Sequence, residues 1–195
     1  MNDLLYNLEN IKTLFTKEHK CRILLYKVAK KIISNTQEYC NSPYKLFYIS
    51  IVSYIAIYFK DRYLLHWSHT SFLKWIDDEI LLNGCVRDCW IYDNLDYQVF
   101  SLMLIRHCIE ALSQSDRKFD YLNYKNPCGS SIKKSIYYLI PYIKKEKIHI
   151  SNLYPINKIQ FPPQIWNIYH CAEVFGMYRN MDDTIKNVYL QYFAF

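Results

Sequence analysis

Cys85 and Cys89 have three residues between them, and a thiolate is a strong zinc ligand. A set of four ligands would need one of two further pairs, His107 with Cys108 or His170 with Cys171. Structural zinc sites usually carry tighter C-x2-C pairs, and the second such pair is missing here. Since free cysteines are among the most buried residue types, we expect buried thiols and predict no metal site.

Arg62 and His69 have six residues between them, a spacing that resembles the R-x4-6-H motif of HEPN-type ribonucleases. This resemblance implies cleavage of RNA by a helical enzyme. The sequence departs from the motif at Tyr63, where the family usually has Asn, Asp or His. With six arginines and six histidines in the chain, such a spacing arises readily by chance.

A second resemblance involves His66-Trp67-Ser68 and His149-Ile150-Ser151, which are similar to the paired H-x-S/T motifs of 2H phosphoesterases. It implies that the two histidines act as acid and base across a cleft. In that family both motifs lie on strands, whereas the first one here precedes or begins a predicted helix. We therefore expect these residues to be capping or surface residues.

Several well-defined catalytic loops are absent from the sequence. It contains no G-x-G-x-x-G, no G-x-x-x-x-G-K-[ST], no G-x-S-x-G and no H-E-x-x-H. Their absence argues against nucleotide hydrolysis, dinucleotide redox chemistry and zincin chemistry. We predict a chain with no catalytic residues and no cofactor.

The charges are segregated along the chain although the net charge is only +6. Residues 1–60 carry nine bases against four acids, and residues 61–116 carry four bases against nine acids. Residues 117–160 then have nine bases against two acids, and residues 161–195 have two against three. The acidic run Asp77-Asp78-Glu79 is poorly spaced for a metal site, and we interpret it as solvated surface.

The segment 117–160 combines lysines with tyrosines, which favours contact with phosphates and with unpaired bases. Lysine outnumbers arginine eighteen to six, so any binding should depend on shape and salt. A solvated helix end would explain the same lysines. The predicted RNA-binding residues are Arg117, Lys118, Lys125, Lys133, Lys134, Tyr137, Tyr138, Lys144, Lys145 and Lys147.

The preferred functional hypothesis is a non-catalytic factor that binds RNA or a ribonucleoprotein, in its most specific form a ribosome-occupying, dormancy-type factor. The ribosome is the expected target in this form because it is the most abundant RNA surface in a cytosol. The alternative is a helical protein–protein interaction module that accepts a partner helix in an apolar groove. The third hypothesis is a HEPN-like or 2H-like RNA-directed hydrolase.

The periodicity that must position these residues is helical throughout most of the chain. Apolar residues recur at three- and four-residue steps over 4–15, 24–33 and 97–112. The uncharged run 46–59 predicts a buried central helix, and Ser68, Thr70 or Ser71 is predicted to cap the next one. Asn83-Gly84 should end that helix.

Later in the chain, Ser130 and Ser131 predict a helix that Pro141 should end or kink. Residues 148–163 alternate and contain prolines, which predicts a short extended segment. Two helices should follow, the second capped by Asp182 or Asp183. We therefore predict a mainly α fold, a single compact bundle-like domain over residues 1–195.

Seven cysteines and the absence of a secretory signal at the acidic N-terminus indicate reduced thiols and a cytoplasmic location. The longest uncharged apolar stretch, residues 46–59, has fourteen residues, whereas a helix that crosses a bilayer needs about 20. We therefore expect no membrane partner. The expected partner is RNA or a ribonucleoprotein, with a protein partner as the alternative.

Overall fold

The computed structural model describes residues 19–35, 43–92, 95–115, 119–144 and 168–193. The regular structure within these ranges is helical, and the one β feature there is an isolated antiparallel bridge between Ile80 and Val86. The fold is all-α, as predicted. The predicted helix 4–15 and the predicted extended segment 148–163 lie outside the described residues.

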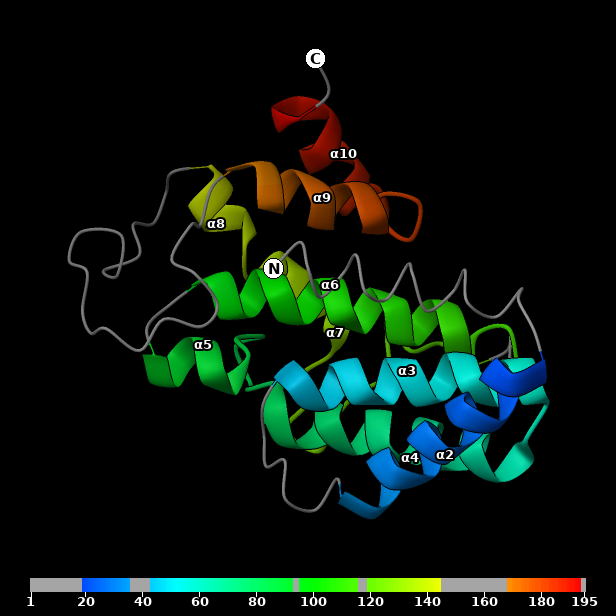
Figure 1. Ribbon diagram of the computed structural model, residues 1–195. Helices are drawn as coiled ribbons and strands as arrows, with labels where there is room; N and C mark the ends of the chain where they lie inside the picture. The colour runs from blue at the N-terminus through cyan, green and yellow to red at the C-terminus, as the bar shows by residue number, and fades with distance from the viewer. Residues whose placement is uncertain (1–18, 36–42, 93–94, 116–118, 145–167, 194–195) are drawn as a thin grey trace. The chain divides into compact units, whose positions relative to one another are not determined.

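Figure 1 shows the order of the helices along the chain. They are α2 (His19–Asn35), α3 (Pro43–Phe59), α4 (Arg62–Glu79), α5 (Arg87–Tyr92), α6 (Leu95–Leu112), α7 (Ile132–Tyr137), α8 (Ile140–Ile143), α9 (Ile168–Tyr178) and α10 (Asp183–Tyr192). None of the described helices is long and apolar enough to cross a membrane.

The chain divides into two compact units. Unit 1 comprises residues 1–75 and 107–119, and unit 2 comprises residues 76–106 and 120–195. The helices α4 and α6 contribute residues to both units. That the two units form one domain stays a prediction.

The centre of unit 1 is α3, which buries residues on every side because its sequence carries no charge between Lys45 and Lys60. α2 packs against it and buries Ala29. The start of α4 differs from the prediction. Asp61 caps this helix by accepting hydrogen bonds from the N–H groups of Tyr63 (2.9 Å) and Leu64 (3.0 Å), and Thr70 lies inside the helix.

Unit 2 is organised around two buried side-chain amides. Gln98 accepts a hydrogen bond from the Val86 N–H (2.7 Å) and donates to the carbonyl oxygens of Gly84 (3.1 Å) and Ser135 (2.9 Å). Asn126 donates to the carbonyl oxygen of Ile80 (2.7 Å) and accepts from the N–H of Ser130 (2.7 Å). Each amide joins loops to helices, so the loops that connect short helices are held without regular strands.

Helix caps in unit 2 agree with the sequence. Ser131 caps α7 and Asp182 caps α10, both by side-chain oxygens that accept backbone N–H groups. The helix that Ser131 begins already ends at Tyr137, before Pro141. Pro141 lies in the first turn of the separate short helix α8, where a proline has no N–H bond to lose.

Candidate functional site

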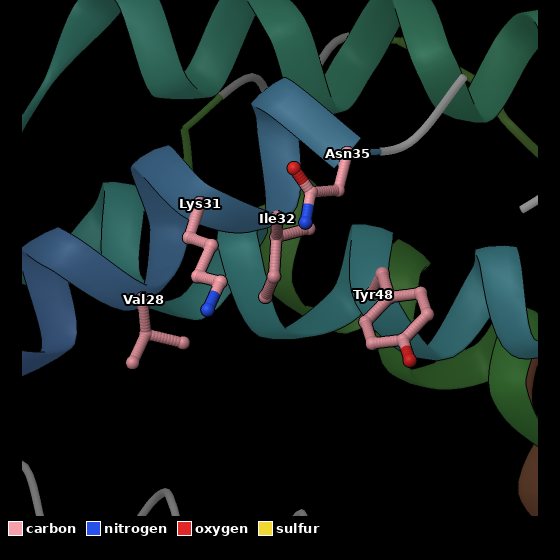
Figure 2. Close-up of a pocket in the computed structure, with 5 residues that line it drawn as sticks. All are labelled: Val28, Lys31, Ile32, Asn35 and Tyr48. Atoms are coloured by element: carbon pink, nitrogen blue, oxygen red, sulfur yellow. The ribbon is translucent and has the colours of Figure 1, made fainter. Parts of the chain in front are cut away.

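A small pocket lies beside α2 and α3 in unit 1 and has a volume of about 180 Å³. Its lining residues come from one side of α2 and from one tyrosine of α3 (Figure 2): Val28, Lys31, Ile32, Asn35 and Tyr48. Residues three and four apart on a helix are neighbours on its surface, so the amphipathic pattern of α2 itself brings its four lining residues together.

The polar atoms of the pocket belong to three different chemical groups. Lys31 offers an ammonium that attracts carboxylate or phosphate, Asn35 an amide, and Tyr48 a phenol that can give or take a proton. Val28 and Ile32 supply the apolar part of the lining. The pocket therefore suits an anionic ligand that also carries hydroxyl groups and an apolar ring face.

Tyr48 lies one helical turn from a second phenol, Tyr44. Partial burial raises the pKa of Tyr44 above its usual value of 10.0, and the neighbouring Tyr48 charge raises it further. Tyr44 is therefore a weaker acid than an ordinary phenol. Of this pair, Tyr48 is the phenol that lines the pocket.

Tyr48 is held on a firmly packed helix. Its neighbours Leu46 and Ile49 are fully buried, and the Cys108 thiol at the end of α6 donates to the Leu46 carbonyl oxygen at 3.5 Å. Burial raises the pKa of Cys108, so this thiol remains a neutral donor. The packing of α3 thus holds the Tyr48 phenol in place, and α2 supplies the Lys31 ammonium and the Asn35 amide.

The pocket belongs to the basic part of the molecule. The described residues of unit 1 carry nine Lys and Arg against two acids, Asp61 and Glu110, a difference of +7. Those of unit 2 carry eight bases against nine acids, a difference of −1. Folding therefore concentrates positive charge in unit 1, which favours a polyanionic ligand there.

The RNA-binding residues predicted from the sequence do not lie at this pocket. Arg117, Lys118, Lys145 and Lys147 lie outside the described residues. The others belong to unit 2, where the charges balance: Lys125, Lys133, Lys134, Tyr137, Tyr138 and Lys144. Lys125 and Lys144 are exposed, whereas Lys133 and Lys134 are half-buried.

Several of these side chains have structural partners within unit 2. Lys133 forms an ion pair with Asp182, with 2.6 Å between Nζ and Oδ2, and the Tyr137 hydroxyl donates to the same carboxylate at 2.7 Å. The hydroxyl groups of Tyr138 and Tyr142 lie 3.2 Å apart. Burial and the Tyr142 hydrogen bond raise the pKa of Tyr138. These contacts stabilise the fold of unit 2.

The other sequence candidates do not assemble into a site among the described residues. Arg62, His66 and His69 all lie on α4, and the His69 ring meets the Phe119 ring edge-on at 5.0 Å. His149 lies outside the described residues. Cys85, Cys89 and Cys108 are buried, and the part of the chain that the structure describes holds no group of three or more potential metal ligands.

Sequence reasoning missed Lys31, Asn35 and Tyr48. The apolar periodicity over 24–33 leaves Lys31 on the polar side of its helix, and Tyr48 belongs to the run 46–59, which is predicted to be buried. The available signal was weak: a polar pair four residues apart, Lys31 and Asn35, at the end of an amphipathic helix whose apolar stripe includes Val28 and Ile32. Only the packing of α2 on α3 adds the phenol.

Comparison with known proteins gives one finding. The family model of alginate lyases matches residues 24–149, which is more than half of the 195-residue chain and includes all five residues that line the pocket. No curated protein and no solved structure matches the chain.

This match corrects the functional hypotheses drawn from the sequence. The predictions of a non-catalytic chain, of an RNA-binding or ribosome-associated factor, and of RNA or a protein as the partner are wrong, because the matched family consists of polysaccharide-cleaving enzymes. The same match overturns the interaction-module and RNA-hydrolase alternatives. The four motifs that are absent from the sequence serve other reactions, so their absence says nothing about a polysaccharide lyase.

Proposed function

Because the chain belongs to the alginate lyase family, we propose that it is a polysaccharide lyase that cleaves alginate. The family match over residues 24–149 carries this proposal. The pocket of unit 1 supports it, since Lys31, Asn35 and Tyr48 lie within the matched region.

Alginate is a chain of 1,4-linked uronic acids, so each sugar has a carboxylate next to the carbon that a lyase deprotonates. A base removes the proton from C5, and the electron pair forms a C4=C5 double bond. The C4–O bond then breaks, and the departing oxygen takes up a proton. The site must stabilise negative charge on the carboxylate and must supply one group for proton transfer.

The pocket residues match these tasks. Lys31 would pair with the carboxylate and draw charge away from C5, and the Asn35 amide would donate a hydrogen bond to the same group. Tyr48 would take the C5 proton as a phenolate and return it to the departing oxygen, which restores the phenolate.

The size of the pocket fits part of a polymer. Its volume of about 180 Å³ lies below the roughly 300 Å³ at which pockets for drug-sized ligands begin. It therefore suits a single sugar of a chain whose other sugars lie outside it.

The test is to incubate the full chain with polymannuronate and with polyguluronate and to follow the ultraviolet absorbance of the unsaturated product. We expect Tyr48→Phe to lower kcat by about 10²-fold or more. Tyr192→Phe on α10, which removes a half-buried phenol from unit 2, is the matched control and should leave kcat unchanged. No product from either polymer would refute the function, and an active Tyr48→Phe variant would refute the site.

A cytoplasmic location remains part of the proposal. It is supported by the described cysteines, which are present as thiols: Cys21, Cys85, Cys89, Cys108, Cys128 and Cys171. Fractionation of the source cells, followed by detection of the chain with an antibody, tests it. Recovery in a secreted fraction would contradict it.

A further inference from the structure

Exposed apolar side chains are concentrated in two short segments of the chain. Among the described residues, six of the ten exposed large hydrophobic residues belong to α2 or to residues 77–92, which comprise the end of α4, a turn and α5. They are Ile23, Leu24 and Val28 in the first segment and Leu82, Trp90 and Ile91 in the second. Single exposed apolar residues are ordinary, but groups of them mark interaction surfaces.

The first segment is basic, and we call residues 19–35, the helix α2, the basic segment. It contains five Lys and Arg and no acid, a charge of +5. Lys27 comes four residues after Ile23 and three after Leu24, so these three exposed side chains share one side of the helix. Ala29 lies on the buried side, where α2 packs on α3. The basic segment therefore presents apolar groups and ammonium groups together.

The second segment is built on α5, and we call residues 77–92 the acidic segment. The Arg87 guanidinium attaches α5 to the end of α4, because it donates to the Asp78 carbonyl oxygen at 2.6 Å. Cys89 is buried, and the next two residues, Trp90 and Ile91, project outward from the same short helix. Trp90 has 66% of its surface accessible. Such exposure is costly for so large an apolar side chain unless a partner covers it.

The charge of the acidic segment is opposite to that of α2. It contains four acids and one base, a charge of −3. The base, Arg87, lies 3.7 Å from the carboxylate of Glu79, which is buried, so these two charges offset each other. The negative charge that the segment offers to a partner therefore comes from three half-buried residues, Asp77, Asp78 and Asp88.

We propose that the basic segment of one copy of this chain docks on the acidic segment of a second copy. Leu24 would pack against Trp90, and Lys27 would face the carboxylates, so one contact removes apolar surface from water and pairs opposite charges. A second copy is the fitting partner because this one chain carries both complementary surfaces. Two basic segments would repel each other, so the contact joins unlike surfaces and is heterologous. The inference does not depend on lyase activity.

The experiment measures self-association of the full chain by sedimentation velocity between about 1 and 200 μM. Leu24→Gln alters the basic segment and Trp90→Gln alters the acidic segment. Leu190→Gln on α10 is the matched control, because Leu190 is also an exposed large apolar residue and lies outside both segments. All three positions are exposed, so the variants should fold, and circular dichroism checks that they do.

We expect the original chain to form complexes larger than the 23.7 kDa monomer, with a Kd on the order of 10 μM at low salt. Raising the salt to about 0.5 M should increase the Kd several-fold, because it screens the charges. Leu24→Gln and Trp90→Gln should each increase the Kd about tenfold, and Leu190→Gln should behave like the original chain.

A mixture of the two variants gives the sharpest test. The Trp90→Gln chain keeps an intact basic segment and the Leu24→Gln chain keeps an intact acidic segment, so an equimolar mixture should associate again although each variant alone does so weakly. Failure of the mixture to associate would overturn the inference, as would a monomer at every concentration. Association of Trp90→Gln alone with the original Kd would show that like segments meet, and it would overturn the inference too.

Discussion

The Lys133 ammonium lies 2.6 Å from a carboxylate oxygen of Asp182, the residue that caps α10, so the ion pair joins α7 to the start of the last helix. Asp182 also accepts hydrogen bonds from the Tyr137 hydroxyl and from two backbone N–H groups. Partial burial acts to raise the pKa of Asp182, but the partners Lys133, Tyr137 and Ile185 lower it to about 2.

This lowered pKa predicts a loss of stability in acid. A carboxyl group with a folded pKa of about 2 and an unfolded pKa of about 3.9 contributes stability that is fully present above the unfolded value and is lost as the pH falls towards 2. Asp182→Asn keeps a good capping residue but removes the charge. Urea unfolding at pH 7, 4 and 2.5 should therefore show a smaller acid-dependent loss in Asp182→Asn than in the original chain. Equal losses would contradict the prediction.

The buried amide of Gln98 predicts a large stability effect. Gln98→Leu leaves the Val86 N–H and the Gly84 carbonyl oxygen without the partners they have in the fold. Each unsatisfied buried group costs about 1–3 kcal/mol, so the free energy of unfolding should fall by about 3 kcal/mol. Urea denaturation measures this change. Gln191→Leu at an exposed position of α10 is the control and should stay within about 0.5 kcal/mol.

Substitutions at two glycines distinguish the stability cost of backbone strain from that of steric crowding. Gly84 and Gly129 both have positive φ, +89° and +81°, but a Cβ at Gly84 would lie 2.4 Å from the Lys134 carbonyl oxygen, whereas one at Gly129 would meet nothing within 4 Å. Gly129→Ala should cost about 1 kcal/mol from strain, and Gly84→Ala roughly 3 kcal/mol because a backbone carbonyl must also move. Equal costs in chemical denaturation would show that crowding at Gly84 is relieved elsewhere.

The cysteines should differ in reactivity. Cys128 is exposed, whereas Cys108 and Cys171 are buried. Burial, with a smaller contribution from the Asp96 charge, raises the pKa of Cys171 to about 12. Only the thiolate is nucleophilic, so iodoacetamide should label Cys128 first in the native chain. Peptide mass spectrometry identifies the labelled sites, and labelling in urea provides the control. Early labelling of Cys108 would show that the end of α6 opens readily.

Substitution of two lysines of α2 tests whether the pocket is the site of catalysis. Lys31 lines it, whereas Lys27 is an exposed residue of the same helix that does not. Lys31→Gln should lower kcat/KM for polymannuronate by about 10²-fold, because the positive charge that stabilises the carboxylate in the transition state is lost. Lys27→Gln removes an equal charge and should change kcat/KM by less than about twofold. Similar losses in both variants would show that only the net charge of α2 matters.

The sequence by itself determined the local elements. Apolar residues at helical spacing predicted α2 and α6, and the uncharged run 46–59 predicted α3. Ser131 and Asp182, each one of two neighbouring candidates, cap α7 and α10, because capping depends on residues within one turn. The start of α4 was missed. Asp61 caps that helix, and the Thr70 hydroxyl bonds back to the His66 carbonyl oxygen at 2.9 Å inside it, since a threonine can satisfy its hydroxyl in a helix as well as at a cap.

The tertiary structure alone decided which charges matter. The acidic run was interpreted as solvated surface, yet Glu79 is 1% exposed and has the Arg87 guanidinium 3.7 Å away. Lys133, predicted to bind RNA, is paired with Asp182, a residue 49 positions later in the printed sequence. Lys31 is exposed, as the polar side of its helix requires, and it lines a pocket with Tyr48 because α2 packs on α3. A charge count along the chain cannot contain such pairings, since ion pairs and pockets form between segments that only folding brings together.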